Sequence, residues 1–298
     1  MARVELGVHI GPQDIDLDEL RLLWRRCDAA GFDLITVWDH FYESPPVDGS
    51  HPVFESIASL AALALETRRC RIGCLCFGMG YRNPALLAKS LTTIDHLSKG
   101  RLTVGLGAGW HEPEHDGYGF RFPPVKERMD RLSEGVRIVR ALFTQERSTF
   151  VGEYYQVKDA PNAPRPVQER IPIIVGGGGE RRTLRIAARW ADGSNQAYIS
   201  PEEYRHKNAV LDQWCEQLGR DPRTLERSVN VHFRMSSRGT PPAGAQPDGA
   251  ISGSPLEVVD RLGQYVDAGA QRISLAIRPP VDLDALETFV DRVMPAFR

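Results

Sequence analysis

Residues 71–106, RIGCLCFGMGYRNPALLAKSLTTIDHLSKGRLTVGL, contain one complete unit of the pattern that decides the fold. Arg71–Phe77 is an apolar run of strand length, and Leu102–Leu106 is a second such run. Between them, Pro84–Leu97 is amphipathic and begins with a proline in its first turn, as helices often do. A strand, a helix and a second strand in this order predict two parallel strands joined by a crossover helix.

The same alternation extends along the whole chain. Further strands are expected at Val4–Ile10, Leu34–Trp38, Ile171–Val175, Ala191–Ala197, Val229–Arg234 and Gln271–Ile277. Further helices are expected at Leu17–Gly31, Val53–Glu66, Val125–Phe143, Arg181–Trp190, Pro201–Leu218, Pro255–Ala268 and Asp282–Met294. About eight strand–helix units in 298 residues predict a single α/β domain over residues 1–298, a (β/α)8 TIM barrel. An open doubly wound sheet is the alternative.

Two segments do not follow the alternation. Residues 107–170 are expected to form inserted loops around one helix, with residues 144–170 irregular because three prolines there break helices. Gly239–Gly253 is rich in glycine and proline and is expected to be a loop.

The composition argues against several classes of protein. A net charge of −2 without clustered basic residues speaks against a nucleic-acid or membrane surface. The first residues do not resemble a signal peptide, and no window approaches the roughly 18 apolar residues of a membrane span. The five cysteines are an odd number, which favours a reducing compartment and hence a cytoplasmic protein.

No metal site is expected. Cys74 and Cys76 would share one face of a strand, but no second pair of ligands lies nearby, so they are interpreted as small buried side chains. His111 and His115 are four residues apart, as on one face of a helix. However, Pro113 lies between them and glycines follow, which argues against a helix there.

The second expected strand ends in Trp38-Asp39-His40-Phe41, and its polar pair would open onto the mouth of a barrel. Histidine exchanges protons near neutral pH, so His40 is the candidate proton donor or acceptor. Asp39 would orient His40 or bind a cofactor amide. The alternative is a helix cap and an ordinary loop histidine.

A run of four glycines, Gly176–Gly179, lies between an expected strand and an expected helix. Glycines let an anion approach the backbone closely, and a helix N-terminus offers free N–H groups and a positive dipole end. Arg181 and Arg182 add positive charge. The run therefore predicts a phosphate site, with a merely flexible turn as the alternative.

The fourth expected strand leads into Gly105-Leu106-Gly107-Ala108-Gly109-Trp110-His111-Glu112. Small residues at a strand end permit a flat ring to lie against the backbone, with His111 at the mouth. A glycine-rich turn with surface polar residues is the alternative. The end of the third strand, Gly73–Gly78, offers only thiols and by itself indicates a core strand.

Together these segments resemble the luciferase-like monooxygenase superfamily, in particular its branch that depends on a deazaflavin, coenzyme F420. The resemblance covers nearly the whole chain. Its most specific blocks are Trp38–Phe41, Tyr81–Lys89, Thr93–Arg101, Gly105–Glu112, Glu127–Leu132, Pro172–Gly179 and Ala191–Gly193.

The resemblance implies a TIM barrel with its cofactor ring at the carboxyl-terminal mouth. It implies that Asp39 and His40 contact the ring or supply a proton, and that a non-proline cis peptide at Leu75–Cys76 forms a bulge behind it. The phosphate would lie on Gly177 and Gly178. The full set of cofactor-binding residues then expected is Asp39, Leu75, Cys76, Gly78, Ala108, His111, Gly176, Gly177, Gly178 and Gly179.

One departure from the family concerns the substrate. Sugar-phosphate dehydrogenases of the branch are expected to carry a catalytic glutamate where this chain has Ala108, and the next polar position is His111. The glucose-6-phosphate reaction is therefore not expected, and only the cofactor site is carried over.

The function expected is hydride transfer between coenzyme F420 and a small organic substrate, with His40 as proton donor or acceptor. The nearest alternative is an FMN-dependent monooxygenase of the same superfamily, which uses reduced flavin and oxygen. A phosphate-binding aldolase or isomerase and a non-catalytic cofactor-binding barrel are further alternatives. A homodimer is expected because dimers are common in the family.

Overall fold

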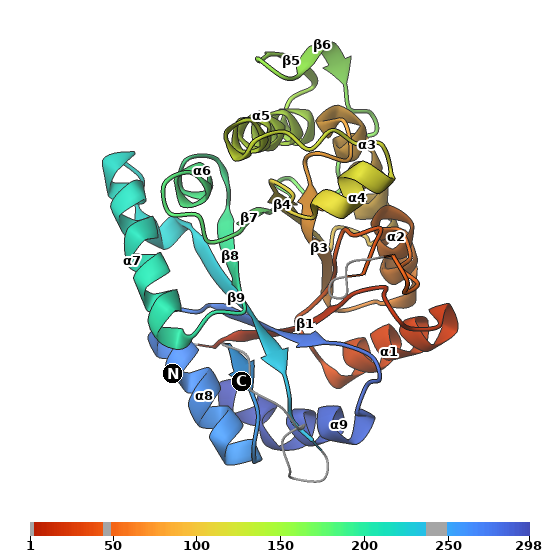
Figure 1. The fold of residues 1–298 in the computed structure, drawn as a ribbon, viewed down its shortest axis with the longest axis vertical. Helices are drawn as coiled ribbons and strands as arrows, with labels where there is room; N and C mark the ends of the chain where they lie inside the picture. Colours follow the sequence, from red (N-terminus) through yellow and green to blue (C-terminus); the bar gives the residue numbers. More distant parts are fainter. Residues whose placement is uncertain (1–2, 44–48, 237–248) are drawn as a thin grey trace.

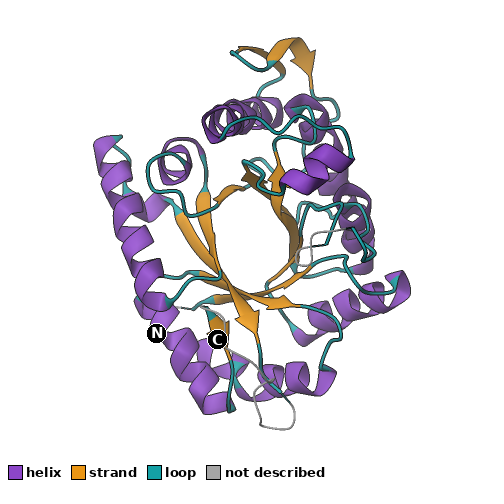
Figure 2. Ribbon diagram, in the orientation of Figure 1, coloured by secondary structure: helices purple, strands orange, loops and turns teal. Residues whose placement is uncertain are grey.

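The computed structural model describes residues 3–43, 49–236 and 249–298. Its eight main strands run parallel and close into a barrel (Figures 1 and 2). These strands are β1 (Glu5–Ile10), β2 (Leu34–Val37), β3 (Arg71–Gly78), β4 (Leu102–Gly107), β7 (Ile173–Gly176), β8 (Gly193–Ala197), β9 (Glu226–Phe233) and β11 (Arg272–Ile277). Strand β11 pairs with β1, and β8 pairs with β9, so the sheet has no open edge between them. The expected TIM barrel is confirmed, and the open doubly wound sheet is excluded.

Helices cover the outside of the barrel (Figure 2). They are α1 (Leu17–Ala30), α2 (Ser56–Glu66), α3 (Pro84–Leu97), α5 (Val125–Thr144), α6 (Thr183–Trp190), α7 (Pro201–Gln217), α8 (Pro255–Asp267) and α9 (Leu283–Arg292). Local sequence determines several of their ends. The Asn83 side chain caps α3 ahead of Pro84, and Gly31 ends α1 in the left-handed conformation with φ 90°.

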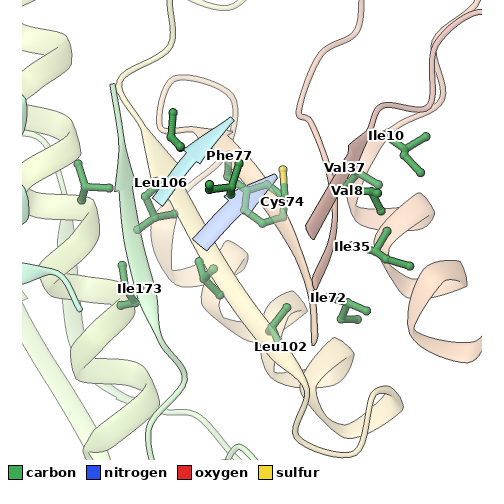
Figure 3. Close-up of a cluster of buried hydrophobic side chains, with 14 of the residues drawn as sticks. Val8, Ile10, Ile35, Val37, Ile72, Cys74, Phe77, Leu102, Leu106 and Ile173 are labelled. Atoms are coloured by element: carbon green, nitrogen blue, oxygen red, sulfur yellow. The ribbon is translucent and has the colours of Figure 1, made fainter. Parts of the chain in front are cut away.

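Apolar strand residues fill the layer between barrel and helices (Figure 3). Val8 lies opposite Ile35, Ile35 opposite Ile72, and Ile72 opposite Leu102 in the strand registers, and all four are fully buried. Because successive strand side chains point to opposite faces, the residues between them face the barrel interior. His9 is one of these interior residues, and it reaches the cavity described below.

The insertion between β4 and β7 contains more regular structure than expected. Strands β5 (Arg147–Val151) and β6 (Gln156–Pro161) form an antiparallel hairpin within the segment expected to be irregular. That expectation was wrong because Pro161 is the last residue of β6, and the other two prolines follow the strand.

A short helix, α4 (Glu112–Gly117), occupies the segment for which a helix was argued against. Pro113 lies in the first turn of α4, where its missing N–H costs no helical hydrogen bond. Gly117 is the last residue of the helix, so neither residue interrupts it. The expectation that no helix forms here was therefore wrong.

Most of the expected loop 239–253 lies outside the described residues. From Gly249 onward the chain is described, and β10 (Ala250–Ile251) pairs in parallel with the end of β9. Among the described helices, none has the length and apolar character needed to cross a membrane.

Candidate active site

The carboxyl ends of the barrel strands surround a cavity of about 370 Å³. Active sites of TIM barrels lie at this end, and the volume falls within the range of about 300–1,000 Å³ typical of small-molecule sites. Its lining consists of the residues that end or directly follow the strands, with one contribution from the start of α6. These residues are His9, Trp38, Asp39, His40, Leu75, Cys76, Gly78, Tyr81, Gly107, Ala108, Gly109, Trp110, Gly176, Gly177, Thr183, Asn195, Ala197, Tyr198, Asn230 and Arg278.

Most of the expected site residues meet in this cavity. The residues brought together are Asp39, His40, Leu75, Cys76, Gly78, Ala108, Gly176 and Gly177. His111, Gly178 and Gly179 are not part of the lining. His111 is buried instead, its Nε2 lies 3.2 Å from the Glu43 carbonyl oxygen, and its ring packs against the His40 ring.

His40 is held by a buried carboxylate that the sequence analysis did not assign. It donates from Nδ1 to Glu114 Oε1 at 2.6 Å, and the Tyr81 hydroxyl donates to Glu114 Oε2 at 2.6 Å. The Glu114 side chain is fully buried, whereas that of His40 is 15% exposed and lines the cavity. With Nδ1 engaged by Glu114, Nε2 is the His40 nitrogen left to exchange a proton with a bound molecule.

The charge state of this group follows from its hydrogen bonds. Burial by itself would raise the pKa of Glu114, but hydrogen bonds from His40 and Tyr81 hold that pKa below its ordinary value. Burial and the neighbouring Glu114 raise the pKa of Tyr81 far above its ordinary value. At neutral pH, Glu114 is therefore an anion that accepts two hydrogen bonds, and Tyr81 remains a donor.

Asp39 lines the cavity, and its carboxylate bonds residues of α2 and of the β3 end. Its Oδ1 accepts from the Ser56 hydroxyl at 2.5 Å, and its Oδ2 accepts from Arg82 Nη1 at 2.7 Å and from the Gly78 amide at 3.0 Å. Arg82 also bonds Glu55 at 2.5 Å. Both carboxylate oxygens of Asp39 thus tie the end of β2 to α2 and to the end of β3.

The bulge expected in β3 is present. The Leu75–Cys76 peptide is cis, and the pairing of β3 with β4 shifts register between Cys74 and Phe77. This bulge brings Leu75 and Cys76 to the cavity wall, opposite Gly176 of β7. A Cβ atom at Gly176 would collide with the Cys76 sulfur, so only glycine permits this close approach.

The thiols of β3 have no features of nucleophiles or metal ligands. Burial raises the pKa of Cys76 to about 12 and that of Cys74 well above its ordinary value, so both remain protonated at neutral pH. Within the described part of the chain, no group of three or more His, Cys, Asp or Glu residues is arranged to hold a metal ion.

The four-glycine turn divides into two halves. The Gly177 amide donates to the Asn195 carbonyl oxygen at 3.1 Å, so it is not available to a ligand. Within residues 3–43, 49–236 and 249–298, the amides of Gly178, Gly179 and Thr183 donate to no protein acceptor. Free amides at the N-terminus of α6 suit a phosphate group.

The remaining wall of the cavity comes from the last strands of the barrel. His9 is buried and hydrogen-bonds Thr36 at 2.8 Å, and burial, with Arg278 nearby, lowers its pKa to about 3. The Tyr198 ring stacks on His232 with centroids 4.0 Å apart. Arg278 is the only residue with a positive side-chain charge among the described residues that line the cavity.

The fold and this site define a class of protein: a TIM barrel with a small-molecule cavity at its mouth, lined by a histidine that bonds a buried carboxylate and bordered by free amides at a helix N-terminus. Comparison with known sequences places the protein within that class. The chain belongs to the luciferase-like monooxygenase family, whose sequence profile matches residues 1–238.

Two relatives match the chain over most of its length. The chain is similar to an F420-dependent glucose-6-phosphate dehydrogenase from Intrasporangium calvum, with 28% identity and 92% of each chain covered. A protein of the same name from Amycolatopsis mediterranei is 32% identical, with 89% of this chain and 83% of the relative covered.

Three solved structures share the fold. An F420-dependent secondary alcohol dehydrogenase in complex with an F420–acetone adduct superposes with a TM-score of 0.87 at 18% identity, with 99% of each chain covered. The F420-dependent tetrahydromethanopterin reductase from Methanopyrus kandleri gives 0.85 at 18%, with both chains fully covered. A Baeyer–Villiger monooxygenase from Pseudomonas putida in complex with FMN gives 0.78 at 16%, with 98% of each chain covered.

Proposed function

We propose that this protein is an oxidoreductase that transfers a hydride between coenzyme F420 and a small organic substrate. The observation that carries the proposal is the pair of His40 and Glu114 at a cavity that also opens to the glycine turn before α6. The F420-dependent relatives cover nearly the whole chain and support this choice of cofactor.

The residues in and beside the cavity fit a deazaflavin ring that carries a phosphate group. Gly107, Ala108, Gly176 and Gly177 contribute little or no side chain to the wall, which leaves space for a flat ring over the ends of β4 and β7. Leu75 and Cys76 lie on the β3 bulge and would support the ring from behind. Gly178 and Gly179 lie outside the cavity lining, where their free amides would bind the phosphate.

Within this arrangement the ring supplies the hydride chemistry, and the protein supplies position and protons. Nε2 of His40 gives or takes the proton that accompanies the hydride. Glu114 fixes the orientation of the imidazole through its hydrogen bond with Nδ1. His111 packs behind His40 and would help to position it, while Asp39 holds the β2 end in place rather than bonding the cofactor.

We propose a substrate other than glucose 6-phosphate, although the relatives carry that name. Ala108 places no carboxylate in the cavity, and the carboxylates of Asp39 and Glu114 are committed to protein partners. Arg278 is the single cation among the described lining residues, which is little for a phosphorylated sugar beside a phosphorylated cofactor. A neutral alcohol or carbonyl compound suits this lining better.

Titration of the purified protein with oxidised F420 and with FMN tests the cofactor. F420 should bind more tightly, seen as a change in its absorbance and fluorescence. Gly178→Asp should weaken that binding at least tenfold, because the new carboxylate repels the phosphate, while thermal unfolding changes little. Tight FMN binding without any response to F420 would favour the monooxygenase alternative, whose fold is also shared.

We also propose that the protein works in the cytoplasm and as a homodimer. All five cysteines are free thiols, which suits a reducing compartment. The dimer is proposed from the family resemblance, and light scattering of the purified protein tests it: a mass near 33 kDa instead of twice that value would contradict it.

A further inference from the structure

The active-site cavity has two unlike halves. The ends of β3, β4 and β7 form the half assigned to the cofactor ring. The other half comes from a continuous arc of neighbouring strands, β8, β9, β11, β1 and β2. Besides Asp39 and His40, its polar lining residues are His9, Asn195, Tyr198, Asn230 and Arg278. We call this half the polar half, and a substrate that lies on the ring would face it.

His9 presents one free ring nitrogen to the polar half. It lies in β1 between Val8 and Ile10, which pack in the outer layer (Figure 3), so its own ring points into the barrel and is 4% exposed. Its Nδ1 lies 2.8 Å from the Thr36 hydroxyl of β2. Among the described residues, Nε2 has no hydrogen-bond partner, and the protein does not enclose it. Because the ring lines the cavity, Nε2 opens onto it.

The hydrogen bonds of Thr36 determine which tautomer His9 adopts. The Thr36 hydroxyl also lies 3.4 Å from the Val8 carbonyl oxygen, to which it donates. A hydroxyl has one hydrogen, so Nδ1 must carry its own hydrogen and donate it to Thr36. This arrangement makes both bonds, whereas the other tautomer makes only one of them. Nε2 of His9 therefore has a lone pair without a hydrogen and is an acceptor.

The surroundings keep His9 neutral. Burial, the Arg278 guanidinium beyond β11 and the His40 ring beyond β2 all lower its pKa, to about 3. Arg278 lies over the Trp38 ring at 5.7 Å, and the Trp38 ring is 5.2 Å from that of His9. With cationic groups on both neighbouring strands, a protonated imidazole is disfavoured, and Nε2 remains an acceptor at neutral and mildly acidic pH.

Other polar groups of this half already bond the protein. Asn195 Nδ2 donates to the Ser228 hydroxyl at 3.1 Å and to Asn230 Oδ1 at 3.2 Å. Both carboxylate oxygens of Asp39 are bonded as described above. A buried acceptor that a ligand leaves without a donor costs free energy, so the cavity favours a ligand that offers a donor to His9.

We propose that Nε2 of His9 accepts a hydrogen bond from a hydroxyl group of the substrate, on a carbon other than the one that exchanges the hydride. This rests on the proposed function, since it places the cofactor ring in the opposite half. The substrate class is then a hydroxylated carbonyl compound, or the diol that its reduction forms. His9 pairs with Thr36, four residues before His40, and so lies deeper in the barrel. The hydroxyl end of the substrate points inward, and the carbonyl end lies beside His40.

Calorimetric titration of the protein saturated with oxidised F420 tests this proposal. The probes are cyclohexanones with a hydroxyl and a methyl group on one carbon, at ring position 2, 3 or 4, each compared with its dimethyl counterpart. A tertiary hydroxyl cannot be oxidised to a carbonyl, and oxidised F420 has no hydride to give, so only binding is measured. For at least one position the hydroxyl compound should bind more tightly. This preference should be equal at about pH 5.5 and about pH 8, because His9 does not titrate there.

Variants of His9 separate the hydrogen bond from the shape of the probe. His9→Phe keeps a ring and removes the acceptor, so the ratio of hydroxyl to dimethyl affinity should fall at least fivefold. His9→Gln places an amide oxygen near the former Nε2 and should restore part of the ratio. His96→Asn, at an exposed position of α3, is the control and should keep the wild-type ratio. Equal affinities at all three positions, or a ratio that survives in His9→Phe, would overturn the proposal.

Nitrogen-15 NMR of histidine-labelled protein provides an independent test, since protonated and bare ring nitrogens resonate far apart. The signals missing from His9→Gln belong to His9 and should show a bare Nε2. A protonated Nε2 would make His9 a donor and refute the proposal. So would a tenfold loss of F420 affinity in both His9 variants at an unchanged unfolding temperature, because Nε2 would then hold the cofactor. Failure of the proposed function differs from these outcomes: the wild type would bind FMN and not F420.

Discussion

At the scale of single residues, chemistry in the cavity depends on Glu114 as much as on His40. The sequence indicated His40, because a histidine directly after a strand lies at the mouth of a barrel. It did not indicate Glu114, which comes from a short helix in the insertion and reaches His40 across 74 residues of sequence. Tyr81 and Arg82 follow the end of β3 directly, so the rule that identified His40 could also have identified them.

Substitution of His40 and Glu114 separates binding from proton transfer. His40→Asn should lower the single-turnover rate of F420 reduction or oxidation by about 10²–10⁴-fold, because the proton donor or acceptor is lost. Glu114→Gln should lower it less, since the amide oxygen still accepts from Nδ1 but carries no charge. The affinity for F420, measured by fluorescence, should stay within a few-fold in both. A full rate in His40→Asn would contradict the proposed role.

His9, which lines the cavity, should make the stability of the folded protein depend on pH in the acid range. Its pKa of about 3 in the folded protein is below the usual 6.5, so the unfolded chain binds the extra proton first as the pH falls. The free energy of unfolding should therefore decrease between about pH 6.5 and 3, by at most about 1.4 kcal/mol per pH unit from this group.

Urea unfolding at a series of pH values measures this effect. His9→Asn should show a shallower decrease than the wild type, since asparagine does not titrate. His96→Asn, at an exposed position of α3 where the ring bonds a backbone carbonyl and no carboxylate, is the matched control and should follow the wild type. Identical slopes for His9→Asn and the wild type would show that His9 does not contribute.

At the scale of elements, the close approach of β3 and β7 shapes the cavity wall. Gly176→Ala places a methyl group against the Cys76 sulfur, and overpacking of this kind typically costs about 1–3 kcal/mol. We expect lower stability in urea and weaker F420 binding. Cys76→Ala removes the sulfur, so the double variant should recover most of the stability. Additive losses in the double variant would contradict a direct clash.

At the scale of the whole molecule, Arg272 of β11 links β1 and β9, the two strands between which β11 closes the barrel. It is 5% exposed and binds Glu5 of β1 and Glu226 of β9, each at 2.5 Å. Arg272→Ala should lower the free energy of unfolding at pH 7 by about 1–3 kcal/mol, because Glu226 and the partly exposed Glu5 then lose their shared hydrogen-bonded cation. Arg223→Ala, in an exposed pair with Asp221, is the control and should change little.

The pH dependence of the Arg272 variant provides a second check. Burial raises the pKa of Glu226, so protonation relieves the repulsion as the pH falls. The loss of stability in Arg272→Ala should therefore be smaller at pH 5 than at pH 7. An equal loss at both pH values would indicate that packing, not charge, is responsible.

Much of the fold was predictable because most barrel strands are apolar runs and the crossover helices are amphipathic. Strand β8, Gly193–Ala197, is an exception, since its sequence GSNQA is mainly polar. The insertion was less predictable, because the hairpin of β5 and β6 lies outside the barrel and only part of it is buried. Side-chain pairs such as Asp39 with Arg82 depend on tertiary contacts that periodicity does not encode.

The pairing of β1 with β11 has a consequence for synthesis. Glu5 and Arg272 are 267 residues apart, so the ring of strands cannot close until the segment that contains β11 has been synthesised. Until β11 is in place, one edge of β1 has no hydrogen-bonded neighbour, and Arg278 is missing from the cavity wall. Before that point the unpaired edge of β1 favours aggregation, and a ligand of the completed cavity cannot stabilise the chain.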